Sequence, residues 1–353
     1  MSDEFEPKAA PNFAEGLYLA PMVRASTLPM RITATQLGAT ACFTDVIIDQ
    51  KLMKSKRQVR NNGTPYPIVE YIVHDSSGNP NTAFQTCALE GPVICQIGSA
   101  NDVYATSAVT KVDRDVSAFD LNCGCNVSFS TKGDMGVNRM FDLESTSAVL
   151  KAMVRATNKP VTVKTRLYHE IDPDNVGQRR DLEFLAMAEQ AGVKAITIHA
   201  RYPKDSRSAA VHWERLRLIR ESANIPVIAN GGLMTEDDIT ACQDASGCTS
   251  FMLARGAFSG ISMFHRAPVD GIDFLAKLYD ASVLCNVSMK NAKYNLNFGF
   301  KGRKALVPTE KRVALQLCKS FDEIGAVLNF GSAADVARRY SSDMETKRSN
   351  DSD

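Results

Sequence analysis

The sequence predicts an α/β fold: a TIM (β/α)8 barrel followed by a small C-terminal helical domain. Eight short, apolar, β-rich segments alternate with helix-favouring stretches between residues 17 and 253, and eight strand–helix units are the number in this barrel. Polar residues or glycines follow the strand segments, at the end where such barrels hold their active sites. The strand signals stop after about residue 266, and helical patterns continue.

The strand segments are short apolar runs bounded by turn-forming residues, which is typical of buried parallel strands. They cover residues 17–20, 41–43, 93–97, 118–121, 161–164, 195–199, 226–229 and 250–253. Helices are expected between them, each long enough to cross back over a parallel sheet. The clearest helical patterns cover residues 27–37, 144–157, 181–191, 213–222 and 236–245.

Residues 68–86 interrupt this alternation, because two β-rich runs flank the turn-forming residues SSGNP at 76–80. We therefore expect a β-hairpin inserted before the third barrel strand. Beyond the barrel, helices are expected at 273–285 and 311–328. The predicted organisation is a flexible N-terminus over residues 1–16, a barrel over 17–266, a helical domain over 267–340 and a disordered tail over 341–353, which has little to bury.

Composition limits the classes of function. The chain has 353 residues, 44% of them hydrophobic, and a net charge of +1, so it can bury a large core and does not attract polyanions over its whole surface. Two basic segments, residues 51–60 and 301–312, are more typical of solvated helix faces than of binding patches.

The cysteine pattern and the N-terminus indicate the compartment. Nine cysteines without framework spacing predict reduced thiols, and the Cys123-x-Cys125 pair is too close and isolated for a zinc site. No apolar run is long enough to cross a membrane, and the acidic first residues do not resemble a signal peptide. We expect a soluble, monomeric protein of the cytoplasm or nucleus, with no metal and no membrane partner.

Residues capable of chemistry recur at the carboxyl ends of the predicted strands. A polar residue at one strand end can be structural, since histidine there is often hydrogen-bonded and lysine can extend to solvent. Repetition at one rim favours a binding site instead. The recurring residues are Pro21, Met22, Gln96, Asn122, Cys125, Lys164, His199, Asn230, Gly231, Gly232, Ala254 and Arg255.

The last two rim loops predict a phosphorylated ligand. Asn230, Gly231 and Gly232 follow the seventh strand, and Ala254 and Arg255 follow the eighth, where barrels commonly bind phosphate through backbone N–H groups and an arginine. The glycines could instead serve tight turns alone.

Lys164 faces the same cavity and has two possible roles. It could neutralise negative charge on a bound ring, or its amine could form a Schiff base with a carbonyl substrate. At this point a flavin enzyme and an aldolase-like enzyme both remain open.

Cys125 has two readings of its own. A lone cysteine is commonly a buried structural residue, but this one follows a predicted strand and begins a polar loop, NVSFSTKGDMG. A thiol with an ordinary pKa near ~8.5 stays mostly protonated at neutral pH. We expect no nearby cation to alter it.

Several motifs together resemble those of the dihydrouridine synthases, flavoenzymes that reduce uridine in tRNA. LAPMVRASTLPMR (19–31) is similar to the family's opening signature, and NCGCNVSFSTKGDMG (122–136) to its catalytic loop. The resemblance continues through AFQTCALEGPVICQIGS, PVTVKTR, TIHAR, IPVIANGG, SFMLARGAF and NAKYNL, and covers about residues 17–330. The STKGxMG and NxKYxL patterns are most similar to the eukaryotic branch that modifies position 20 of the tRNA D-loop.

The resemblance implies FMN as cofactor and NADPH as reductant. Pro21 and Met22 would contact the flavin ring, Gln96 would bond its pyrimidine edge, and Lys164 and His199 would lie beside it. The FMN phosphate would be held by Asn230, Gly231, Gly232, Ala254 and Arg255. Hydride would pass from reduced FMN to C6 of the uracil, and the Cys125 thiol would give a proton to C5.

The resemblance also implies tRNA contacts and extrusion of the target base, because a uracil inside folded tRNA cannot reach the flavin. The residues expected to hold substrate are Asn122, Arg24, Lys132, Arg201, Lys293 and Arg303. Three positions depart from the family pattern: Asn126 where proline is usual, and Asp134 and Ala200 where glycine is common. Asn126 is expected to loosen the loop that aims the thiol.

Two other functions remain open from the sequence. The chain could be a flavin barrel enzyme that acts on a free pyrimidine or another small molecule, in which case the helical domain has no role. It could also be a catalytically impaired relative that binds tRNA, a reading motivated by Asn126.

Overall fold

The computed structural model describes residues 6–61, 66–127, 133–169, 176–259, 264, 271–300 and 307–350, with the backbone alone for 342–350. Eight parallel strands form a closed barrel, because β1 pairs with both β12 and β2, and β2 pairs with β7. In order around the barrel they are β1 (Gly16–Leu19), β2 (Ala41–Phe43), β7 (Val93–Gly98), β8 (Ala118–Asn122), β9 (Val161–Arg166), β10 (Ala195–His199), β11 (Val227–Asn230) and β12 (Ser250–Leu253). The predicted TIM barrel and all eight strands are confirmed.

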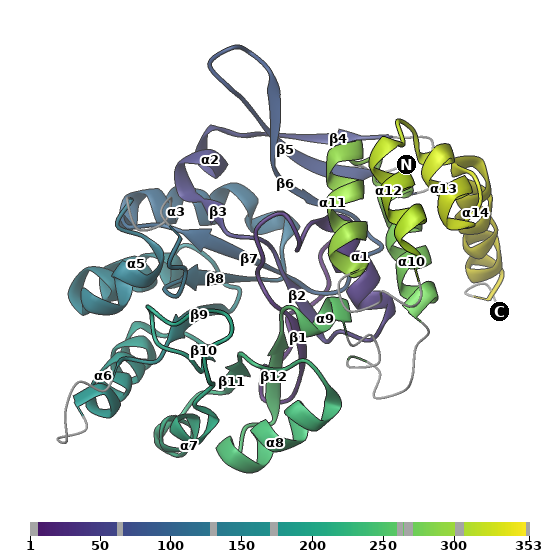
Figure 1. Cartoon of the computed structure of the whole chain (residues 1–353). Helices are drawn as coiled ribbons and strands as arrows, with labels where there is room; N and C mark the ends of the chain where they lie inside the picture. The colour runs from purple at the N-terminus through teal and green to yellow at the C-terminus, as the bar shows by residue number, and fades with distance from the viewer. Residues whose placement is uncertain are drawn as a thin grey trace.

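Helices surround the barrel (Figure 1). The outer helices are α1 (Leu28–Gln36), α3 (Asp102–Val112), α5 (Leu143–Arg155), α6 (Val176–Ala191), α7 (Trp213–Ser222) and α8 (Glu236–Ser246). Local chemistry fixes their ends. At α8, Thr235 and Asp238 form a reciprocal capping box, and Gly247 ends the helix at φ 72°. Short 3-10 turns, η1 (Asp113–Asp115) and η2 (Gly136–Phe141), precede β8 and α5.

The predicted hairpin is confirmed, but it belongs to a three-stranded antiparallel sheet. β4 (Lys56–Arg60), β5 (Ile68–His74) and β6 (Pro80–Thr86) follow the short β3 (Ile47–Ile48) and α2 (Asp49–Lys54). The expectation of a helix face over residues 51–60 is therefore wrong for β4, which pairs along its length with β5. Strand pairing with an apolar neighbour outweighs the helix preference of these basic residues.

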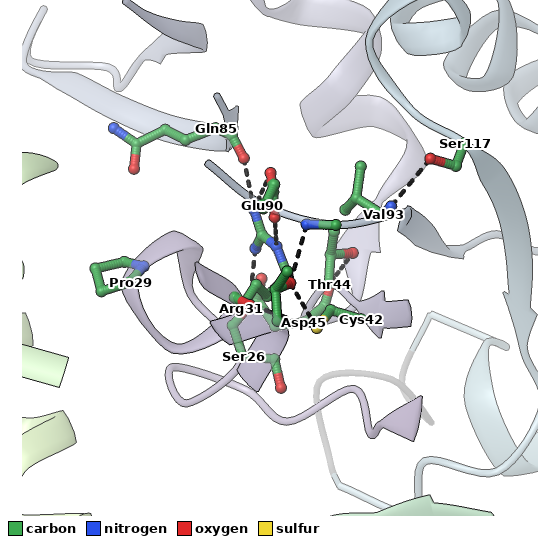
Figure 2. Close-up of polar contacts among 12 residues, drawn as sticks. Ser26, Pro29, Arg31, Cys42, Thr44, Asp45, Gln85, Glu90, Val93 and Ser117 are labelled. Atoms are coloured by element: carbon green, nitrogen blue, oxygen red, sulfur yellow. Dashed lines mark hydrogen bonds and ion pairs between the residues drawn. The ribbon is translucent and has the colours of Figure 1, made fainter. Parts of the chain in front are cut away.

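A buried ion pair joins α1 to the segment between the inserted sheet and β7. Arg31 on α1 donates from Nε to Oε2 of Glu90 at 2.7 Å, and both side chains are almost completely buried. The same guanidinium donates to the carbonyls of Ser26 (2.9 Å) and Gln85 (2.6 Å) (Figure 2). This arginine therefore connects the sheet with the loop that follows β1.

The helical elements after the barrel are grouped beside α1 and the inserted sheet (Figure 1). They are α10 (Gly271–Leu284), α11 (Met289–Phe300), α12 (Thr309–Leu317), α13 (Phe321–Leu328) and α14 (Ala333–Asn350), after the short α9 (Gly256–Ser259). The helix expected over 311–328 is two helices, because the Ser320 hydroxyl accepts from the N–H of Glu323 and starts α13. The predicted domain boundary at 266 and 267 lies outside the described residues.

Both ends of the chain differ from expectation where they are described. Phe13 is 1% exposed, stacks on Tyr18 and accepts through its carbonyl a hydrogen bond from Ser250. Residues near Phe13 therefore close the amino end of the barrel, and the flexible N-terminus is wrong for this segment. For residues 341–350, which the sequence predicts to be disordered, the structure describes the backbone of α14, which continues to Asn350. Helix needs no buried face when polar side chains pair along it, as Arg338 does with Asp335.

Candidate functional site

A cavity of about 540 Å³ opens at the carboxyl ends of the barrel strands, a volume suited to a small-molecule ligand. The alternation of a strand explains its lining, because residues two apart on one strand face the same side. Residues from seven strand ends, separated by more than two hundred positions, meet there. The sequence-predicted residues in its wall are Pro21, Met22, Gln96, Asn122, Cys125, Lys164, His199, Arg201, Asn230, Ala254 and Arg255.

Cys125 lies on a loop held by hydrogen bonds at three points. The Asn122 Oδ1 atom accepts from the N–H groups of Gly124 (3.2 Å) and Cys125 (3.0 Å). Arg166 Nε donates to the Gly124 carbonyl at 2.7 Å, and the Cys125 carbonyl accepts from the N–H of Val137 at 2.8 Å. Cys125 is also the only one of the nine cysteines whose side chain is not buried. The buried structural reading of this residue is therefore wrong.

Two cations lie close enough to Cys125 to interact with it electrostatically, Lys164 and Arg166. The sequence did not indicate that these two cations lie near the thiol. The reason is strand register: β9 is the parallel neighbour of β8, and Lys164 pairs with Asn122 across the two strands. Arg166 follows two residues later on the same face of β9.

Lys164 is an amine whose charge is easily lost. Its Nζ donates to Oδ1 of Asn230 at 2.9 Å, and Asn230 in turn donates to the carbonyl of Met252 at 2.7 Å. Burial, followed by the charge of Arg166, lowers the pKa of Lys164 to about 7. Such an amine can hold an anion as a cation or act as a nucleophile when neutral, so the geometry by itself allows both predicted roles.

His199 is neutral in this environment. Burial lowers its pKa well below 6.5, and the charges of Lys164, Arg166, Arg201 and Arg255 lower it further. Its Nδ1 atom is buried and has no hydrogen-bond partner among the described residues. A buried imidazole nitrogen without a partner is costly, and a polar ligand that fills the cavity beside the ring can reduce that cost.

Arginines gather on the side of the cavity formed by the loops after β10 and β12. Arg201 Nε donates to the carbonyl of Ala209 at 2.8 Å, and Arg255 donates to the carbonyl of Arg207 at 3.0 Å. Burial and the charge of Arg255 lower the pKa of Arg201. A cation whose pKa is depressed by burial and like charge is stabilised when an anion binds. This side of the cavity therefore suits a phosphate.

The two glycines after β11 do not line the cavity. Gly231 (φ 104°) leaves room for the His199 ring, since a Cβ atom there would lie 3.0 Å from Cδ2 of the ring. At Gly232 (φ 82°), a Cβ atom would lie 2.9 Å from the Val211 side chain and 3.0 Å from the Trp213 ring. Their positive φ angles and close packing require glycine. The predicted contact of these residues with phosphate remains a prediction.

Comparison with known proteins identifies the family to which this chain belongs. The dihydrouridine synthase (Dus) family model matches residues 18–305. The chain belongs to the dihydrouridine synthase family.

Among its relatives is the tRNA-dihydrouridine(20) synthase (NAD(P)+) of Schizosaccharomyces pombe. It is 27% identical over 303 residues, which cover 81% of this chain and 60% of that protein. The protein of the same name from Saccharomyces cerevisiae is 32% identical over 232 residues, covering 63% of this chain and 58% of that protein. The chain thus spans about three fifths of the length of each yeast relative.

The solved structures similar to this one include the old yellow enzyme homologue from Zymomonas mobilis. It is 8% identical, with a TM-score of 0.49, and the match covers 76% of this chain and 93% of that chain.

Two side chains of the helical domain also line the cavity, and the sequence did not single them out. Tyr294 and Phe298 lie one helical turn apart on α11, with ring centroids 6.2 Å apart and planes nearly parallel. Tyr294 is 38% exposed. It belongs to the NAKYNL motif, so the family resemblance could have indicated it. Asp120 and Arg166 were missed as well, although Arg166 shares the inward face of β9 with Lys164.

Of the residues predicted to hold substrate, Asn122 and Arg201 line the cavity, whereas Arg24 and Lys293 do not. Arg24 is exposed but does not line the cavity, and its backbone N–H donates a hydrogen bond to the carboxylate of Asp45. Lys293 Nζ donates to the carbonyls of Gln316 (2.9 Å) and Cys318 (2.7 Å), at the end of α12. Lys132 and Arg303 lie outside the described residues. The tRNA contacts of all six remain predictions.

The three departures from the family pattern are accommodated locally. Asn126 donates from Nδ2 to the carbonyl of Pro203 at 2.9 Å, so a contact with the neighbouring loop restrains the position where proline is usual. Asp134 adopts a φ of 53°, a conformation that aspartate tolerates better than most residues. Ala200 is completely buried.

No helix in the described part of the chain is both long and apolar enough to cross a membrane. Within the same residues, no three histidine, cysteine or acidic side chains are arranged to hold a metal ion.

Proposed function

We propose that the chain is an FMN-dependent oxidoreductase that reduces uridine to 5,6-dihydrouridine in the D-loop of tRNA, at position 20, with NADPH as reductant. One observation carries the proposal. A single cavity combines a partly exposed thiol, a neutral histidine and a set of cations, on a chain of the dihydrouridine synthase family. The names of the two yeast relatives support the position and the nicotinamide reductant.

The residues of the cavity fit FMN. Pro21, Met22 and Gln96 would contact the ring system, with Lys164 and His199 beside it, and His199 Nδ1 is a buried polar atom that needs a partner. Arg201 and Arg255 would hold the phosphate with Asn230. When bound, FMN would supply a hydride to C6 of the uracil, with NADPH as the source of its electrons. A lysine beside the ring favours the anionic reduced state.

Cys125 is the proposed proton donor. Its Sγ–H gives the proton to C5 of the uracil as the C5=C6 double bond is reduced. Asn122 and Arg166 hold the backbone immediately before the thiol at 2.7–3.2 Å, and the N–H of Val137 holds the Cys125 carbonyl after it at 2.8 Å. This fixed geometry is what general acid catalysis requires. Arg166 and Lys164 can restore charge balance around the thiolate that remains.

The helical domain supports an RNA substrate over a free pyrimidine. Tyr294 and Phe298 make α11 part of the cavity wall, whereas an enzyme for a free base predicts no role for this domain. An exposed aromatic face beside a row of cations is the arrangement that binds an extruded base and its phosphates. The alternative of a catalytically impaired, tRNA-binding relative has less support, because Asn126 is held by a hydrogen bond to the carbonyl of Pro203. Monomeric state and location in the cytoplasm or nucleus remain predictions.

The test is dihydrouridine formation in an unmodified tRNA transcript, with uridine as the alternative substrate. The wild-type protein should be yellow and should oxidise NADPH in the presence of the tRNA, but not with uridine alone. Cys125→Ala should retain flavin and lose about 100-fold or more of the rate, the range of general acid catalysis. Cys248→Ala, at a buried cysteine at the opposite end of the barrel, is the matched control and should be active. Wild-type rates in Cys125→Ala would contradict the assigned donor, and reduction of free uridine would favour the small-molecule reading.

A further inference from the structure

A continuous chain of hydrogen bonds runs from the interior of the barrel to the Cys125 loop. Gln96 Nε2 donates to Oδ2 of Asp120 at 2.8 Å. Asn122 Nδ2 donates to Oε1 of Gln96 at 2.8 Å. The Oδ1 atom of Asn122 then accepts from the N–H groups of Gly124 and Cys125. All these residues lie on β7, β8 or the loop that follows β8.

The two ends of this chain impose a direction on the two amides between them. A carboxylate only accepts hydrogen bonds, and a backbone N–H only donates. With Asp120 at one end and the N–H of Cys125 at the other, each amide has one orientation that satisfies every bond. Reversing Gln96 would place its oxygen against the carboxylate. Reversing Asn122 would place its NH2 group against two N–H donors.

The geometry assigns Asp120 as a positioning residue: its carboxylate orients the side chains of Gln96 and Asn122 and so holds the loop that aims the Cys125 thiol. Asp120 does not line the cavity, so its effect on the thiol passes through Gln96 and Asn122. The term amide relay is used below for Asp120, Gln96 and Asn122.

The burial of Asp120 supports a role beyond packing. Its side chain is completely buried, and a carboxylate in that position is costly unless its oxygens are bonded. Thr162 Oγ1 donates to Oδ1 at 2.7 Å, which leaves Oδ2 for the relay. Burial raises the pKa of Asp120 to about 6, while the bonds from Thr162 and Gln96 and the charge of Lys164 oppose the rise, so the group is ionised at neutral pH.

The inference rests on the proposed function only for the importance of Cys125, and the relay itself can be tested without activity. Asp120→Leu removes the terminal acceptor, so neither amide has an imposed direction. The N–H groups of Gly124 and Cys125 then lose a fixed partner. Their hydrogen exchange, measured by mass spectrometry on peptides covering residues 122–127, should become about tenfold faster, as expected for one lost hydrogen bond.

Two further variants separate the relay from a general loss of stability. Thr162→Val removes the other bond to Asp120 but leaves the relay, so exchange at Gly124 and Cys125 should be unchanged. Asp120→Leu/Gln96→Glu moves the carboxylate one place along the relay, where it accepts directly from Asn122, and should restore slow exchange. If Asp120→Leu does not fold, the double variant alone tests the relay. It should fold, and hydrogen exchange at Gly124 and Cys125 should be as slow as in the wild type.

Unchanged exchange in Asp120→Leu, or a double variant that stays unprotected or unfolded, would overturn the assignment. Dihydrouridine formation is measured in parallel on the same proteins. If Asp120→Leu accelerates exchange but leaves the rate of dihydrouridine formation intact, the relay stands and the role of Cys125 in the proposed function fails.

Discussion

Two groups of basic side chains in this molecule have opposite electrostatic surroundings. In the inserted sheet, Arg57 bonds Asp115 at 2.7 Å and Arg60 bonds Glu70 at 2.9 Å. At the cavity, the hydrogen bonds described for Lys164, Arg166 and Arg201 go to amide or carbonyl oxygens of Asn230, Gly124, Tyr202 and Ala209. The hydrogen bond to Asp115 raises the pKa of Arg57, whereas burial lowers the pKa of all three cavity cations.

The difference distinguishes cations that stabilise the fold from cations that are available to bind an anionic ligand. An arginine bonded to a carboxylate of its own chain has little left to offer a second anion. Cations packed together against neutral oxygens destabilise one another, and an anion that enters the cavity relieves this. The basic segment 51–60 therefore contributes mainly to structure, although its charge density resembles a binding patch.

The largest expected effect is on stability, in the sheet. Arg57→Met removes the guanidinium that bonds the buried carboxylate of Asp115 at 2.7 Å and leaves Arg114 at 3.9 Å, and breaking such a pair should lower the free energy of unfolding by about 3 kcal/mol. Urea unfolding followed by circular dichroism measures it. Lys56→Met, at the exposed neighbouring residue, should change stability by less than about 0.5 kcal/mol. If folded Arg57→Met bound flavin more weakly than the wild type, Arg57 would also serve ligand binding, and the distinction between the two groups of cations would fail.

The next effect is on the ligand, at the cavity. Lys164→Met should weaken FMN binding about 100-fold, or about 2.7 kcal/mol, without lowering the stability of the cofactor-free protein, because a buried cation is removed. Quenching of flavin fluorescence on titration gives the dissociation constant. Lys159→Met is the matched control: this lysine precedes β9 at its other end and donates to the Val116 carbonyl, so FMN affinity should not change. Equal losses in both variants would show that Lys164 acts through the fold.

The smallest effect is a pH dependence. Lys164 has a folded pKa of about 7, below its ordinary value of 10.5, and the charged or titratable groups that face it are Arg166, Asp120 and Cys125. Between these pH values the unfolded chain holds the proton and the folded chain does not, so stability rises with pH. Cofactor-free wild type should gain up to about 1 kcal/mol per pH unit relative to Lys164→Met between pH 7.5 and 9. If the free energy of unfolding changes with pH in the same way in both proteins, the lowered pKa of Lys164 is contradicted.

The strands and the rim were accessible to sequence reasoning because both depend on local pattern. Short apolar runs mark buried parallel strands, and the residue after such a run must lie at the carboxyl rim. Gln96, Asn122, Cys125, Lys164 and His199 were located in this way. Segments whose structure depends on distant partners were not. Phe13 is fixed by Tyr18 and Ser250, and β4 by β5.

By itself, then, the sequence determined that eight strands would carry polar residues to one rim and that Cys125 would be among them, since both follow from the order of residues along short segments. Only the tertiary structure decided which charges lie together. It placed Asp115 beside Arg57, kept carboxylates out of bonding contact with the described polar atoms of Lys164 and Arg166, and completed the amide relay to Asp120. Electrostatic free energy depends on distances in space, and those distances join residues that are far apart in the chain.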